Sequence, residues 1–155
     1  MFVRHELRLG IGFAAARAVL HDLVHSGALA DASRQAYAEG ITGLHRALTP
    51  TAEAELPELL DVQVRERPTR ATTTALALRW EVWDPASGLF PALDADLTLS
   101  TDHPATLLTL AGAYRPPPAF TAARPDRGIV HQAASATTAR FVRRLADALS
   151  DFDHA

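Results

Sequence analysis

Four segments of the chain alternate apolar and polar residues with a period of two, the pattern of a β-strand with one face buried and the other in water. The first segment begins at Phe2 and ends at Ile11, and the other three cover 60–65, 76–83 and 93–100. Short runs of turn-forming residues separate the last three segments. The pattern therefore predicts consecutive hairpins in an antiparallel sheet.

Two further segments are expected to be strands on weaker patterns. The stretch from Ala105 to Arg115 is apolar on both faces as far as Tyr114, which predicts an internal strand or one whose outer face meets a partner. The stretch 40–47 contains two glycines, each of which costs ~1 kcal/mol in a helix interior. We therefore expect a short strand there, although an extension of the preceding helix is the alternative. The sheet would then have about six strands.

Helical spacing of apolar residues predicts three helices. The first covers Phe13 to Leu23, and Gly27 follows it in the position of a C-terminal cap. A second short helix is expected from Asp31, as its N-cap, to about Ala38. The last begins near Ile129, ends near Phe152 and would be ~36 Å long. Because a sheet with one apolar face must cover it, this long helix is the expected cover.

Composition limits the class of protein. The chain has 155 residues, of which 48% are hydrophobic, and this predicts a single α+β domain over residues 1–155. A net charge of −3 offers no general attraction to nucleic acid. The first eight residues carry four ionisable side chains, and no ~20-residue apolar run follows, so we expect a cytoplasmic protein without membrane insertion.

Two residue types are missing from the chain, and their absence excludes several chemistries. All 15 basic residues are arginine, so Schiff-base chemistry and a phosphate-loop lysine are excluded. Cysteine is absent as well, which excludes disulfides, thiol nucleophiles and thiolate metal sites. No cofactor is predicted.

The order of elements, together with three motifs, resembles a known superfamily. The motifs are Leu78–Glu81, Gly88–Leu97 and Tyr114–Pro117. They are similar to those of an uncharacterised actinobacterial group within the START-like superfamily, also called SRPBCC, which includes polyketide cyclases and lipid-transfer domains. The resemblance covers Phe2 to Phe152 and implies the helix-grip fold, a curved antiparallel sheet wrapped around a long C-terminal helix. The activities within the superfamily diverge, so the resemblance implies no single reaction.

The implied fold places an apolar pocket between the sheet and the last helix. His5 lies on the apolar side of its strand, where an imidazole can contact a ligand or transfer protons. Tyr114 and His131 flank the proline-rich loop before the last helix and would form a polar mouth. The expected ligand-binding residues are His5, Leu7, Leu78, Trp80, Leu97, Leu110, Tyr114, His131, Thr137 and Phe141.

One pair of histidines has the spacing of metal ligands. His21 and His25 lie one helical turn apart in the sequence His-Asp-Leu-Val-His, which allows both imidazoles to reach one ion. Asp22 is one methylene shorter than the general-base glutamate of zinc proteases, and no third ligand follows at a recognisable spacing. We therefore interpret the pair as surface histidines and predict no metal site.

Three functions remain open at this stage. The first is the binding of a small hydrophobic molecule, polyketide-like or lipid-like, driven by burial of apolar area. The second is a cyclase or dehydratase in which His5 and Tyr114 act as general acid or base. The third is a dimerisation or interaction module that uses the apolar outer face of 105–115. Through this face the protein would form a homodimer or bind another protein.

Overall fold

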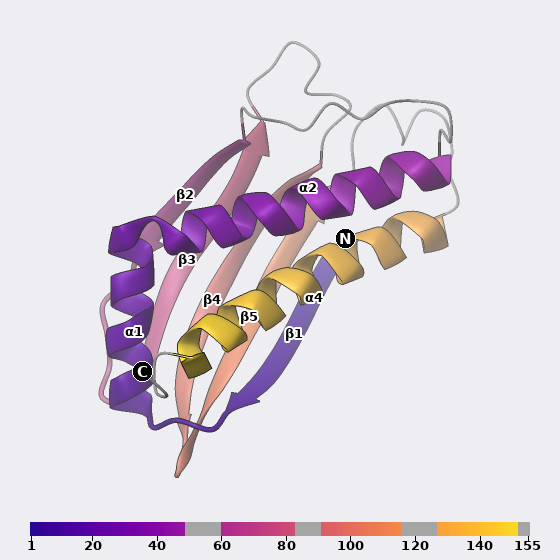
Figure 1. Ribbon diagram of the computed structural model, residues 1–155. Helices are drawn as coiled ribbons and strands as arrows, with labels where there is room; N and C mark the ends of the chain where they lie inside the picture. Colours follow the sequence, from indigo (N-terminus) through magenta and orange to yellow (C-terminus); the bar gives the residue numbers. More distant parts are fainter. Residues whose placement is uncertain (49–59, 83–90, 116–126, 152–155) are drawn as a thin grey trace.

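The computed structural model describes residues 1–48, 60–82, 91–115 and 127–151, and it confirms the α+β class. Within these residues, three helices and five strands follow one another (Figure 1). Their bounds are β1 Phe2–Leu9, α1 Phe13–Ser26, α2 Ala28–Leu48, β2 Leu60–Glu66, β3 Thr73–Val82, β4 Ala92–Asp102, β5 Ala105–Arg115 and α4 Arg127–Asp151.

The five strands form one antiparallel sheet in the order β1-β5-β4-β3-β2. Strands β2 to β5 pair with their neighbours in sequence, as the short turns predicted. Strand β1 completes the sheet beside β5, with His5 opposite Leu110. The doubly apolar β5 is therefore an internal strand, because it has a partner on each side.

The predicted strand at 40–47 is wrong, and the described sheet has five strands rather than six. This segment is the C-terminal half of α2, a helix of 21 residues. Gly40 does not break the helix; it lies where α2 meets α4. A Cβ at this position would overlap the Oγ1, Cγ2 and Cβ atoms of Thr137 on α4. The glycine is thus required by close helix packing, and packing outweighs its unfavourable helix propensity.

The boundary between α1 and α2 is confirmed in part. Gly27 has a φ of 84° and caps the C-terminus of α1, as predicted. The second helix begins at Ala28 rather than Asp31, so Asp31 is not its N-cap. The Asp31 N–H donates to the Gly27 carbonyl at 3.0 Å, and its carboxylate lies in the first turn, where a negative charge is favourable.

Helices α2 and α4 lie side by side across one face of the sheet (Figure 1), and that face carries the core. At its centre the Trp80 ring makes edge contacts with Phe141 of α4 and Tyr37 of α2, at centroid distances of 5.2 and 6.0 Å. The opposite face of the sheet carries charged residues such as Arg79 and Asp94. No helix in the described part of the chain is long and apolar enough to cross a membrane.

We predict that Gly40→Ala destabilises the protein by about 2 kcal/mol, because overpacking at a helix crossing exceeds the ~1 kcal/mol gained from helix propensity. Thr137→Ala in the same chain should recover part of this loss, since it removes two of the three overlapping atoms. Urea unfolding monitored by circular dichroism measures both. The control is Gly10→Ala, whose Cβ would meet nothing within 4 Å. Equal stabilities of the Gly40 and Gly10 variants would contradict the close packing.

Candidate functional site

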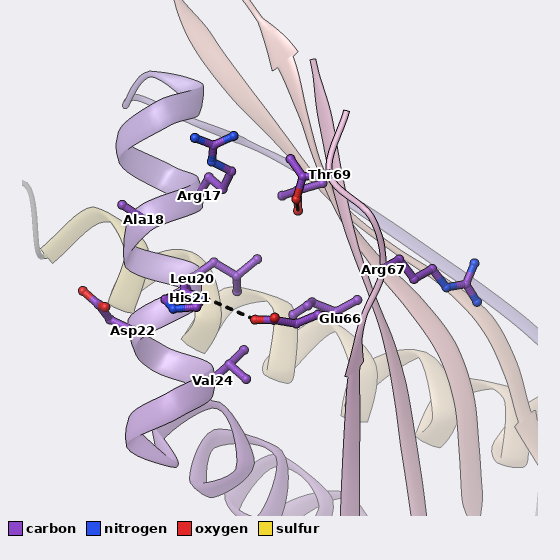
Figure 2. A pocket seen from close by; sticks show the side chains of 11 residues that line it. Arg17, Ala18, Leu20, His21, Asp22, Val24, Glu66, Arg67 and Thr69 are labelled. Atoms are coloured by element: carbon purple, nitrogen blue, oxygen red, sulfur yellow. Dashed lines mark hydrogen bonds and ion pairs between the residues drawn. The ribbon is translucent and has the colours of Figure 1, made fainter. Parts of the chain in front are cut away.

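A cleft of about 390 Å³ lies between α1 and the adjoining ends of β2 and β3 (Figure 2). Helix α1 is held there by its buried residues Ala16, Leu20 and Leu23, which belong to the core. Ile11, just before the helix, is also buried and accepts a hydrogen bond from the Thr106 hydroxyl at 2.8 Å. The cleft is lined by Arg17, Ala18, Leu20, His21, Asp22, Val24, Glu66, Arg67, Thr69, Thr74 and Leu76.

The cleft combines an apolar floor with polar walls. Leu20 and Val24 of α1 point toward the sheet (Figure 2), where Leu76 is buried. Asp22 also lines the cleft, and its carboxylate points away from the strands (Figure 2). Thr69, on the opposite wall, shares a hydrogen bond between hydroxyls with Thr74 at 3.1 Å. The site thus offers both apolar contact and hydrogen bonding.

The two arginines at the cleft differ in their partners. The Arg67 guanidinium points away from α1 and pairs with the Asp96 carboxylate, with an Nη2–Oδ1 distance of 3.0 Å (Figure 2). The guanidinium carbon of Arg17 lies 5.8 Å from the centroid of the Phe13 ring. Among the described residues, no carboxylate lies within ion-pair distance of Arg17. Arg17 is therefore available to an anionic group in the cleft.

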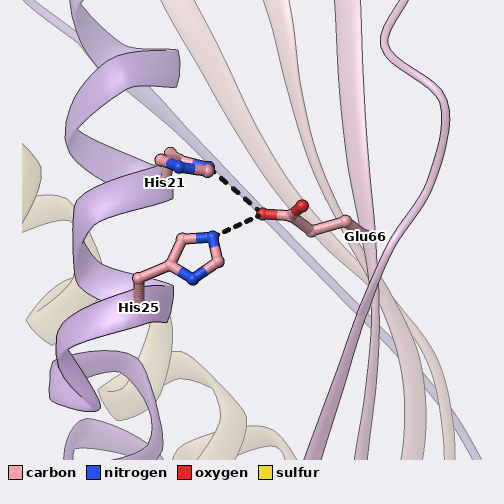
Figure 3. Close-up of side chains that lie close together, drawn as sticks. All are labelled: His21, His25 and Glu66. Atoms are coloured by element: carbon pink, nitrogen blue, oxygen red, sulfur yellow. Dashed lines mark ion pairs between the residues drawn. The ribbon is translucent and has the colours of Figure 1, made fainter.

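His21, His25 and Glu66 meet beside the cleft (Figure 3). The Glu66 Oε1 atom lies 3.3 Å from His21 Nδ1 and 3.6 Å from His25 Nε2. The two imidazole centroids are 4.1 Å apart, because residues four apart share one face of a helix. Both histidine side chains are 60% exposed and the glutamate side chain is 49% exposed.

Glu66 is the partner that sequence reasoning missed. It is the last residue of β2, far from the histidines in sequence, and the antiparallel ladder brings it beside α1. A signal was present, because Val62 and Val64 face the helices and strand alternation places Glu66 on the same face. The alternation does not predict where α1 lies relative to this edge strand.

Most of the predicted pocket residues are buried in the core rather than gathered around the cleft. Leu7 is half-buried, and the exposed His131 lies apart from the rest. The buried residues, each at most 2% exposed, are Leu78, Trp80, Leu97, Leu110, Tyr114, Thr137 and Phe141. The Trp80 ring contacts the rings of Tyr37 and Phe141 between the sheet and helices α2 and α4.

His5 is half-buried beneath α4, where its Nε2 atom lies 2.7 Å from the Thr138 hydroxyl. Burial lowers the pKa of the imidazole below its usual 6.5, and the positive charge of Arg143 lowers it further. A hydrogen bond with the Ser135 backbone opposes these effects. The Thr138 hydroxyl also donates to the Ala134 carbonyl at 2.8 Å, so it accepts from the Nε2–H group of His5.

The two predicted acid–base residues do not lie at one place. Tyr114 follows Leu110, the partner of His5, by four residues along β5, a separation of ~13 Å. Burial raises the pKa of Tyr114, and also that of Tyr37, so both phenols stay protonated. An acid–base role of His5 and Tyr114 on one substrate stays a prediction.

Two buried donors lack a hydrogen-bond partner among the described residues, the Ser33 hydroxyl and the Trp80 indole N–H. The indole N–H of Trp80 is buried and has no hydrogen-bond partner among the described residues, although the neighbouring Tyr37 hydroxyl donates to the Pro91 carbonyl at 2.7 Å. Leaving such a donor unpaired costs about 1–3 kcal/mol.

We predict that the contribution of His5 to stability falls as the pH is lowered below 6.5, the unfolded-state value. With a lowered folded-state pKa, the unfolded chain takes up the proton first, so this stability is present above pH 6.5 and is lost as the pH falls toward the folded-state pKa. His5→Gln keeps a donor for Thr138 but does not titrate. Urea unfolding at pH 7.5 and 5.5 should show a smaller difference between the two proteins at the lower pH. A constant difference would show that His5 is not held neutral.

Comparisons with known proteins give no family for the chain. No protein-family model matches it, and no curated protein matches it. A solved structure of TTHA0849 from Thermus thermophilus has a TM-score of 0.43 at 13% identity, covering 96% of this chain and 97% of that one. Hypothetical protein jhp0584 from Helicobacter pylori has a TM-score of 0.49 at 13% identity, covering 93% and 87%. The vertebrate conserved region of human METTL16 has a TM-score of 0.29 at 14% identity, covering 71% and 92%. At these similarities none of the three assigns a function.

Proposed function

We propose that the protein binds a small amphipathic molecule with an anionic group in the cleft between α1 and strands β2 and β3. The observation that carries the proposal is the cleft itself, whose volume of about 390 Å³ lies within the range of small-molecule sites. Its floor of Leu20, Val24 and Leu76 would bury apolar area of the ligand, worth ~25 cal/mol per Å².

Charge on the cleft walls supports an anionic head group. Arg17 has no described carboxylate partner, whereas Arg67 is already paired with Asp96. Glu66 faces two imidazoles, and the carboxylate of Asp22, which also lines the cleft, points away from the strands (Figure 2). An anion beside Arg17 would therefore gain a charge-assisted contact without displacing an existing ion pair.

A second candidate site lies between the sheet and α4, where the sequence led us to expect a hydrophobic ligand. The unpaired N–H of Trp80 favours it, because a guest with one acceptor atom would satisfy that donor. This candidate site would bind a polyketide-like or lipid-like ligand, as the resemblance to the START-like superfamily implies. To enter, a guest must displace rings that now pack against one another, namely Trp80, Phe141 and Tyr37. The cleft requires no such rearrangement and is the preferred site.

The other two functions stay predictions. The acid–base role would require His5 of β1 and Tyr114 of β5, whose backbone positions are ~13 Å apart along the β1–β5 ladder, to serve one substrate. The dimerisation role of β5 would use its outer face, where Leu107 and Thr109 are half-buried within the monomer.

We predict that 8-anilinonaphthalene-1-sulfonate, an amphipathic aromatic anion, binds the folded protein saturably in the cleft. In a ¹H–¹⁵N NMR titration, the amides of α1 and of the β2–β3 connection should shift, including Arg17, His21 and Thr69. Arg17→Glu should weaken binding at least about twofold, since exposed ion pairs contribute up to ~1 kcal/mol. Arg140→Glu, at an exposed position on α4, is the matched control and should change little.

Two outcomes of the titration would count against the cleft. Shifts confined to Thr137, Phe141 and the strands beneath α4 would transfer the function to the interior site. A lack of saturable shifts, with wild-type near-ultraviolet circular dichroism retained, would remove both candidates for this class of ligand.

A further inference from the structure

We propose that His21, His25 and Glu66 bind a divalent transition-metal ion, with Zn²⁺ the best match, at the edge of the cleft. The three residues offer two imidazole nitrogens and one carboxylate oxygen, all within 4.8 Å of one another. This inference does not depend on the organic ligand proposed above, because the metal can be tested alone.

The distances fit shared coordination better than direct hydrogen bonding. Ligand atoms about 2.0–2.1 Å from a tetrahedral Zn²⁺ lie ~3.3 Å from one another. The Glu66 oxygen lies 3.3 Å from the nitrogen of His21 and 3.6 Å from that of His25. N–H···O hydrogen bonds prefer about 2.7–3.2 Å, so both contacts are longer than that range. The two imidazole nitrogens lie within 4.8 Å of each other, so an ion that bridges all three atoms requires rotation of exposed side chains.

The backbone holds the donors in place from two different elements. His21 and His25 lie inside α1, one turn apart, which fixes the spacing of the two imidazoles. Glu66 is paired with Leu76 of β3 at the end of the β2–β3 ladder. A bound ion would thus connect α1 to the edge strand of the sheet and stabilise that contact in the folded state only.

The donor set selects the class of metal. Two imidazoles with one carboxylate suit Zn²⁺ and neighbouring transition metals, whereas Mg²⁺ and Ca²⁺ prefer sites made entirely of oxygen. Three protein ligands leave a fourth position for water or for a ligand oxygen, the arrangement of open zinc sites. The exposure of all three side chains and the adjacent cleft keep this position accessible.

The simpler interpretation is an exposed cluster in which the Glu66 carboxylate contacts the two imidazoles and no metal ion is bound. Both interpretations predict modest effects of single substitutions on folding, because all three positions are exposed. They differ in metal binding, which only the coordination site predicts. The experiment therefore measures the metal directly.

Tag-free protein treated with EDTA and then freed of chelator should be titrated with Zn²⁺ by calorimetry and thermal unfolding. We expect one equivalent to bind and Tm to rise by at least ~5 °C at a hundredfold excess over Kd. Mg²⁺ should produce neither effect. Absence of saturable Zn²⁺ binding, or equal binding of Mg²⁺, would overturn the proposal.

Substitutions then locate the ion. His25→Ala and Glu66→Gln should each weaken Zn²⁺ binding at least ~100-fold, more than the loss of an outer-shell partner usually costs. The matched controls, His131→Ala and Glu6→Gln, remove an exposed imidazole and an exposed carboxylate elsewhere and should leave binding unchanged. Equal losses in the controls would show adventitious surface binding and overturn the assignment.

A spectroscopic variant makes the test independent of affinity. The chain contains no cysteine, so His25→Cys introduces a single thiol. Thiolate is a strong ligand for zinc-like metals, and Co²⁺ bound to it gives a sulfur-to-metal charge-transfer absorption. We expect that absorption in His25→Cys and not in the control His131→Cys. Its absence from the folded His25→Cys protein, or an equal signal in both, would contradict the site.

Discussion

The close contact between α2 and α4 is the constraint on which the rest of the structure depends. Two long helices share one face of a five-stranded sheet because α2 has no side chain at Gly40, where it meets Thr137. Arg144 of α4 reinforces the contact through Glu39 and through Gln35, the latter at 3.3 Å. Helix α1 joins α2 through a single left-handed residue, Gly27, so its position follows from that of α2. The crossing thereby determines where α1 lies relative to the sheet.

The cleft follows from that placement. One side of α1 is buried in the core, and its neighbouring side faces the ends of β2 and β3. In the described sheet, β2 is an edge strand beside β3, and its final residue on the helix side is the charged Glu66 rather than another aliphatic residue. Two imidazoles, one carboxylate and an arginine with no described carboxylate partner consequently gather around an apolar floor. Elsewhere on this face, the rings of Tyr37 and Phe141 pack against Trp80 in the core. The cleft lies outside this packed region, beside α1.

The sequence predicted the five observed strands, the consecutive hairpins of β2 to β5 and the last helix, because period-two and helical spacing reflect burial directly. It did not predict that α2 continues beyond Ala38, because Gly40 has a low helix propensity. The same residue permits the close contact of α2 with α4, which the sequence pattern does not show. The sequence identified the His21–His25 pair but not Glu66, because their proximity depends on how α1 packs against a distant strand. The ligand site that the sequence predicted beneath α4 stays a prediction, because pattern alone does not distinguish side chains that fill a core from those that line a cavity.

The central claim is that α1 and the end of β2 together form a three-donor site at the margin of the cleft. Anomalous diffraction from crystals grown with Zn²⁺, with data collected on both sides of the zinc absorption edge, tests it most directly. We expect a peak about 2.0–2.2 Å from His21 Nδ1, His25 Nε2 and a Glu66 carboxylate oxygen. A map without a peak there, with these side chains ordered, or one whose only peaks lie at other histidines, would contradict it.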